Sequence, residues 1–169
     1  MKTIGLLLIV ILSTALGASL YDKDRKKVLT FSLLCTVVDE IYSGIRYSGA
    51  TVEELLVTCA ENPLYSSLCF LKQIKTEIEE NGMNQNTVKK SILDSLSDMG
   101  MSREEMMPFL NMAEKLGTTD VTGQLLMLEN CKLQLCELKN IQNRRCETLG
   151  KMYISLGLLL GIGAAVILA

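Results

Sequence analysis

The hydrophobic positions of this 169-residue chain gather in two apolar runs at its ends, residues 4–20 and 152–169, with the polar residues between them. Each run approaches the roughly 20 apolar residues that a helix needs to cross a bilayer, and neither carries a charged side chain. The pattern predicts a transmembrane helix over residues 3–21, a second over residues 152–169, and one polar domain over residues 22–150.

Basic residues flank both predicted membrane helices on the side of the polar domain. They are Lys23, Arg25, Lys26 and Lys27 after the first run, and Arg144, Arg145 and Lys151 before the second. By the positive-inside rule, the central domain faces the cytoplasm. The competing interpretation is that the first run is a cleavable signal peptide, with Ala15 and Gly17 near the cleavage site. The middle would then be an exported, disulfide-linked helical domain with a C-terminal membrane anchor.

The chain has six cysteines, and the compartment decides what they do. An even number suggests three disulfides in an exported domain, whereas the thiols stay reduced in the cytoplasm. In the cytoplasm we expect Cys35 and Cys69 to pack in the core, because apolar residues flank them. Cys131, Cys136 and Cys146 are expected to be the most exposed. A redox or enzymatic use of Cys131 or Cys136 stays open and requires a lowered thiol pKa.

Apolar residues at spacings of three and four predict that the central domain is helical, and strand-forming residues are few. The expected fold class is all-α, an antiparallel helical bundle carried on the two transmembrane helices. Helices are expected over residues 26–46, 66–80, 87–99 and 102–116, with a short one after residue 51 and a long last one after Asp120. Two capping boxes, Thr51 with Glu54 and Ser102 with Glu105, mark two of these starts. Pro108 should bend the helix that contains it.

Small residues line one face of each predicted transmembrane helix. They are Ser13 and Gly17 in the first, and Gly157, Gly161 and Gly163 in the second. Such faces let helix backbones approach closely in lipid. The two helices can use them to pair with each other or to dock another membrane protein, and the sequence leaves both interpretations open.

The sequence offers no residues that we assign to catalysis, to a metal or to a cofactor. It has no histidine, so acid–base catalysis by histidine is excluded, and a zinc site would need four scattered cysteines. Adjacent pairs of glutamates are predicted to be solvated or helix-capping charge, and no phosphate-binding glycine motif occurs. The formal net charge of -2 argues against nucleic acid as a partner. We therefore expect neither an enzyme nor a small-molecule substrate.

Several stretches together carry a resemblance to a known family. They are Ile45 and Tyr47 followed by Thr51 and Glu54, then Leu116, Gly117, Asp120 and Gln124, then Ser155, Leu156 and Gly157. In their order and spacing, the chain resembles the stage III sporulation protein AB family nearly end to end. It departs from the family pattern in having Gly44 where an acid is usual, and Ala50-Thr51-Val52 where Thr-Pro-Leu is usual.

The resemblance implies a non-enzymatic adaptor or scaffold in the secretion-like channel complex between mother cell and forespore. The helical domain of the family is similar to the F component of type II secretion and pilus platforms. The implied partners are a cytoplasmic secretion-type ATPase, other membrane subunits of the channel and the lipid bilayer. The central domain would lie on the mother-cell side.

The surface for these partners is predicted on two stretches that combine turns, charge and apolar residues. The first, around residues 51–54, holds Glu53 and Glu54, and the second, residues 99–107, holds Arg103, Glu104 and Glu105. Methionines between positions 99 and 127 either add a soft binding face or fill the helical core.

Overall fold

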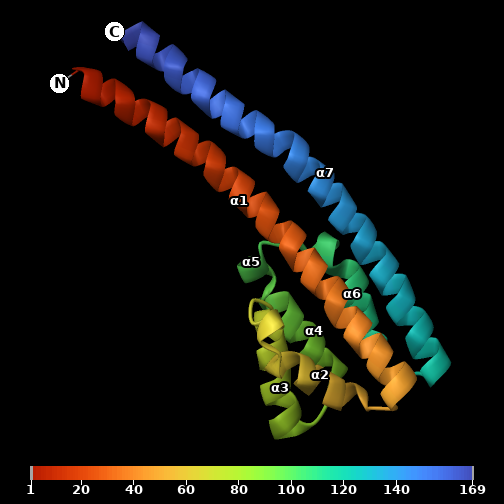
Figure 1. Ribbon diagram of the computed structural model, residues 1–169. Coiled ribbons are helices and arrows are strands. Elements are labelled where there is room, and N and C mark those ends of the chain that lie inside the picture. Colours follow the sequence, from red (N-terminus) through yellow and green to blue (C-terminus); the bar gives the residue numbers. More distant parts are fainter. Residues whose placement is uncertain (1, 169) are drawn as a thin grey trace. The chain divides into compact units, whose positions relative to one another are not determined.

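The computed structural model of the chain is helical, and no strand occurs within residues 2–168 (Figure 1). The structure describes the backbone of these residues and the side chains of residues 15, 19, 21–149, 152, 155 and 159. The elements in chain order are α1 (Lys2–Ser43), the π-helical turn η1 (Gly44–Ser48), α2 (Val52–Glu61), the 3-10 turn η2 (Pro63–Tyr65), α3 (Cys69–Asn81), α4 (Gln85–Asp94), α5 (Leu96–Met99), α6 (Arg103–Lys115) and α7 (Val121–Leu168). The all-α fold class is confirmed for this part of the chain.

The chain divides into two compact units. The terminal unit comprises Met1–Val28 and Asn140–Ala169, and the central unit comprises Leu29–Lys139. α1 and α7 contribute to both units as continuous helices of 42 and 48 residues. The first and last helices of the bundle therefore run on into the apolar ends of the chain, as the sequence predicts.

Within the central unit, α1 and α7 run antiparallel. The thiol of Cys35 on α1 meets that of Cys136 on α7, and one turn further along α1 the Asp39 carboxylate meets Lys132, one turn earlier on α7. The predicted apolar stripe of α1 is buried in this unit. Its members with at most 1% of their surface exposed are Phe31, Leu34, Val38 and Ile41, joined by Val37.

The short helices pack on one another beside this pair (Figure 1). α2 lies against α3, α3 against α4, and α4 against α6. The Phe70 ring on α3 meets the Phe109 ring on α6 edge to face, with ring centroids 5.6 Å apart. Burial of such apolar side chains between elements is the main favourable contribution to folding. The short helices thus share one core with α1 and α7.

Both capping boxes form. Thr51 Oγ1 accepts from the Glu54 amide and the Glu54 carboxylate accepts from the Thr51 amide, at 3.3 and 3.0 Å. Ser102 and Glu105 make the same exchange at 3.2 and 2.7 Å. These reciprocal bonds satisfy backbone donors that the first turn of a helix leaves free. The starts of α2 and α6 are therefore confirmed.

Two other boundaries differ from prediction. The helix expected over residues 66–80 begins at Cys69, because Asn62 caps a separate turn, η2, that starts with Pro63. The helix expected over residues 87–99 begins two residues earlier, where Asn84 caps α4, and is divided at Ser95. With a ψ angle of −2°, Ser95 leaves helical geometry between α4 and α5. Gly100, in the left-handed conformation, then ends α5.

The cysteines correct part of the sequence interpretation. Cys35 is buried as expected, but Cys69 is exposed, while Cys131 and Cys146 are buried at 3% and 6% exposure. Adjacent residues of a helix point about 100 degrees apart, so the buried neighbours of Cys69 do not bury Cys69 itself. All six cysteines, whose side chains lie in the described part of the chain, are free thiols.

Among the residues that the structure describes, one helical segment, Tyr21–Ser48, is long and apolar enough to cross a membrane. Length and composition alone suit a core helix equally, and 39% of its apolar window is buried inside the protein. The segment includes the buried stripe of α1 described above. The predicted transmembrane helices cover residues 3–21 and 152–169, and the structure describes few of the side chains in these two ranges. The two-span arrangement therefore stays a prediction.

In the terminal unit, the polar side chain of Gln142 on α7 is buried at 5% exposure. Its Nε2 donates to the Asp24 carboxylate of α1 at 3.2 Å. Ser155 is exposed. Six predicted residues of this unit fall outside the part of the chain whose side chains the structure describes. They are Leu156 and the five residues proposed for packing in the membrane, Ser13, Gly17, Gly157, Gly161 and Gly163.

Candidate partner-binding site

A surface pocket of about 450 Å³ lies in the central unit where α1 turns into α2 and α6 turns into α7. We call it the turn pocket. Its lining residues are Ile45, Gly49, Ala50, Thr51, Val52, Glu53, Met83, Gly117, Val121 and Gln124. The pocket brings together two stretches, around residues 45–54 and 116–124, that carry the family resemblance at widely separated places in the sequence.

Two glycines shape the turns that enclose the turn pocket. Gly49 follows η1 with a φ angle of +61°, and Gly117 follows α6 with a φ angle of +81°. Residues with a Cβ rarely adopt this left-handed region, so glycine is the favoured residue at both places. Leu116, only 2% exposed, anchors the second turn in the core. An added Cβ at Gly117 would lie 3.7 Å from Cε of Met83 across the pocket.

Gln124 presents the one buried polar atom of the turn pocket that lacks a partner among the described residues. Its Nε2 donates to the Thr119 carbonyl at 2.8 Å, which holds the amide at the start of α7. Its Oε1 is buried and accepts no hydrogen bond from the residues that the structure describes. A buried acceptor without a donor is destabilising, so this amide oxygen costs the start of α7 some stability. Asp120, predicted to cap α7, immediately precedes Val121, and its carbonyl accepts from the Gln124 amide at 2.9 Å.

The predicted acidic residues at α2 divide into two kinds. Glu54 is engaged in the capping box and stabilises the start of α2. Glu53 is exposed at the rim of the turn pocket. Tyr47, also in the family-like stretch, is 77% exposed, and the Arg46 guanidinium lies 5.4 Å from its ring centroid. Ile45 is buried beneath.

The second predicted stretch does not join this site. Arg103, Glu104 and Glu105 begin α6, whereas Gly117, which lines the turn pocket, follows its end. A helix of 13 residues spans roughly 20 Å, so the two stretches form separate surfaces. The nearby methionines mostly fill the core: Met99, Met101, Met106 and Met112 are buried, and Met107 is exposed.

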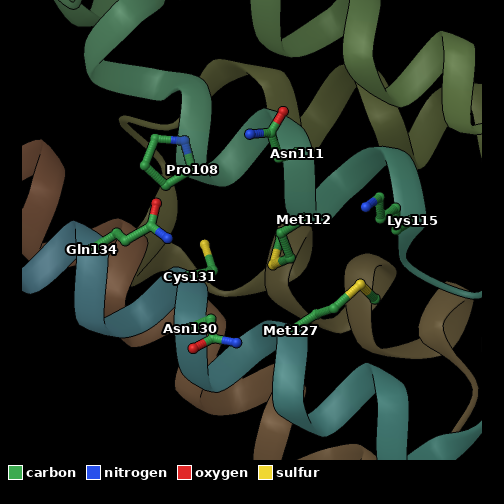
Figure 2. A pocket seen from close by; sticks show the side chains of 8 residues that line it. All are labelled: Pro108, Asn111, Met112, Lys115, Met127, Asn130, Cys131 and Gln134. Carbon is green, nitrogen blue, oxygen red and sulfur yellow. The ribbon is translucent and has the colours of Figure 1, made fainter.

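Another pocket, of about 150 Å³, lies between α6 and α7 (Figure 2). Figure 2 shows Pro108, Asn111, Met112 and Lys115 of α6 facing Met127, Asn130, Cys131 and Gln134 of α7. Burial raises the pKa of the Cys131 thiol to about 12, so this sulfur stays protonated near neutral pH. A nucleophilic cysteine needs a lowered pKa, and Cys131 has the opposite.

Sequence reasoning missed two members of the turn pocket. Met83 comes from the connection between α3 and α4, and Val121 opens α7 with 56% of its surface exposed. Neither residue stands out in the sequence, because the pocket depends on how α2, α6 and α7 pack. The sequence offered one signal for Val121: it is an apolar residue at the first position of a helix, where it is exposed.

These features define a class: a helical bundle built between two long helices that continue to apolar ends, with a small pocket where its turns meet. Groups of three or more metal-binding side chains are absent among the described residues. The chain belongs to the stage III sporulation protein AB family, whose model matches residues 2–169. Membership supports a role in sporulation and confirms the resemblance drawn from the sequence. A search of curated proteins found no match, and neither did a search of solved structures.

Proposed function

We propose that this protein is a non-enzymatic, membrane-anchored adaptor of the channel complex between mother cell and forespore. Residues 3–21 and 152–169 are its transmembrane helices, and the central unit lies in the mother-cell cytoplasm. The adaptor couples a secretion-type ATPase to the membrane subunits of the channel. Continuity of α1 and α7 with the apolar ends supports this arrangement, because force or position sensed in the central unit can pass along unbroken helices.

The observation that carries the proposal is the turn pocket. Four family-like residues line it, Ile45, Thr51, Gly117 and Gln124, and the exposed Glu53 carboxylate lies at its rim. A basic side chain of the ATPase partner would be attracted by the exposed Glu53 carboxylate at the rim. Charge complementarity of this kind contributes mainly to specificity and to the rate of association.

The test is a matched pair of charge reversals, E53K and E104K. Both glutamates are exposed and occupy the second position of a helix that starts with a capping box, so both substitutions carry the same cost against the helix dipole. E53K should weaken binding of the full-length chain to the ATPase by about tenfold, because its charge lies at the turn pocket. E104K should leave binding within a few-fold of the wild-type value.

Thermal melting of both variants provides the control for folding. Equal binding by E53K and wild type at equal thermal stability would remove the turn pocket from the proposal. A loss with E104K that matches or exceeds the loss with E53K would place the contact on the start of α6 instead.

A further inference from the structure

Two thiols from opposite ends of the central unit's sequence are in contact. Cys35 Sγ on α1 lies 3.5 Å from Cys136 Sγ on α7, across a sequence separation of 101 residues. A disulfide brings the two sulfurs to about 2.0 Å, so the bond requires the sulfurs to approach by roughly 1.5 Å.

The two cysteines differ in how far their thiols are exposed to solvent. Cys35 is 7% exposed and belongs to the core, whereas Cys136 is partly exposed at the edge of the core. Next to Cys136 on α7, one turn earlier, Lys132 forms an ion pair with Asp39 of α1 at 2.6 Å. This ion pair and the antiparallel packing hold α1 and α7 in register at the level of the thiols. Cys136 is therefore the thiol that a small molecule in solution reaches first.

We propose that Cys35 and Cys136 form a reversible dithiol pair that a low-molecular-weight disulfide oxidises to a disulfide bond between α1 and α7. The Cys136 thiolate attacks one sulfur of the small disulfide, a mixed disulfide forms, and one small thiolate leaves. Cys35 then attacks the Cys136 sulfur while its proton passes to the second small thiolate, which leaves as a thiol, so the buried Cys35 never stands as a free thiolate. The two protein thiols lose two electrons and two protons, which convert the small disulfide into two small thiols.

Oxidation would change the constraint between the two long helices. In the reduced protein, α1 and α7 are held at this level by packing and by the exposed Asp39–Lys132 ion pair. The disulfide closes a loop that contains α2 to α6 and fixes the register of α1 against α7 covalently. In the reducing cytoplasm proposed above the pair rests as two thiols, and its oxidation offers a way to stiffen the helices that lead into the apolar ends.

The test uses the full-length chain in detergent micelles, with C69S to prevent exposed Cys69 from linking two molecules. The protein is equilibrated in glutathione buffers of increasing oxidised fraction, quenched with acid, alkylated and mapped by mass spectrometry without reduction. We expect a peptide containing Cys35 joined to one containing Cys136, lost again on return to reduced glutathione. The oxidised protein should melt roughly 10 °C higher than the reduced protein.

Two further variants provide matched controls in the same background. C35S removes the resolving thiol, so a glutathione adduct should accumulate at Cys136 and the crosslink should vanish. C131S changes a buried thiol five residues earlier on α7 and should keep the Cys35–Cys136 crosslink. The proposal is overturned if Cys35 and Cys136 stay reduced across the whole range. It is equally overturned if Cys136 in the parent protein carries glutathione to the same extent as in C35S, or if a different pair of cysteines becomes linked.

Discussion

At the scale of single residues, the environment of each thiol decides its chemistry. Cys59 is buried and donates to the Glu40 carboxylate at 3.4 Å. Burial, with a smaller contribution from this hydrogen bond, raises the pKa of the Cys59 thiol to about 12. Cys131 reaches a similar pKa through burial. In both cases the protein favours the neutral thiol, because a buried thiolate would lose its hydration.

These shifted pKa values predict how stability depends on pH. Below about pH 9, the thiols hold their protons in both folded and unfolded chains. As the pH rises toward 12, the unfolded chain releases protons that the folded chain still holds, so unfolding becomes more favourable. We expect each of the two thiols to lower the free energy of unfolding by roughly 1 kcal/mol per pH unit in this window.

Thermal melting of wild type and C131A between pH 8 and pH 11 measures this effect. The stability advantage of wild type over C131A should shrink as the pH rises above 9. C69A, which removes an exposed thiol, is the control for losing a thiol as such. If the melting curves of wild type and C131A fall in parallel with pH, the account of the Cys131 thiol is wrong.

Gly44 shows why a single residue can depart from its family pattern. An ideal Cβ at this position would fall against the Leu55 side chain, 3.0 Å from its Cγ and closer still to its methyl groups. Such distances require Leu55 to shift. The acid that the family resemblance leads one to expect here would therefore require the Leu55 side chain to move aside, which the sequence alone could not indicate.

At the scale of helices and turns, the features that could be predicted are those that depend on residues close together in the sequence. The capping boxes depend on residues three apart, so the starts of α2 and α6 could be read from the sequence. The stripe of α1 follows from helical periodicity alone. The later start of α3 follows from the turn that Asn62 caps at Pro63, a local signal that the prediction did not use, whereas no local signal marks the division at Ser95.

The cap of α6 gives a prediction at this scale. S102A removes the acceptor of the Glu105 amide and should lower the free energy of unfolding by about 1 kcal/mol. Thermal melting of the full-length chain checks the loss, with T51A as the equivalent change at α2. Replacement by threonine, S102T, keeps a hydroxyl and should recover most of the stability. A melting temperature that S102A leaves unchanged would contradict the assigned cap.

At the scale of the whole molecule, the family and the all-α class could be predicted from the sequence, whereas the turn pocket could not. The pocket requires Met83, Gly117 and Gln124 to meet residues near Thr51, and only the packed bundle defines those contacts. The cysteines illustrate the same limit, because the contact between Cys35 and Cys136 joins residues 101 positions apart. Sequence patterns located the helices, and tertiary packing selected which side chains share a site.

We propose that both ends of the chain are anchored in one membrane and that the central unit faces the mother-cell cytoplasm. Exposed Cys69 serves as the reporter, in a variant whose other five cysteines are replaced by serine or alanine and whose melting shows that it is folded. A maleimide that cannot cross membranes is applied to intact sporulating cells and to permeabilised cells. The account predicts that Cys69 is labelled only after permeabilisation. Labelling of Cys69 in intact cells would place the central unit outside and contradict the account.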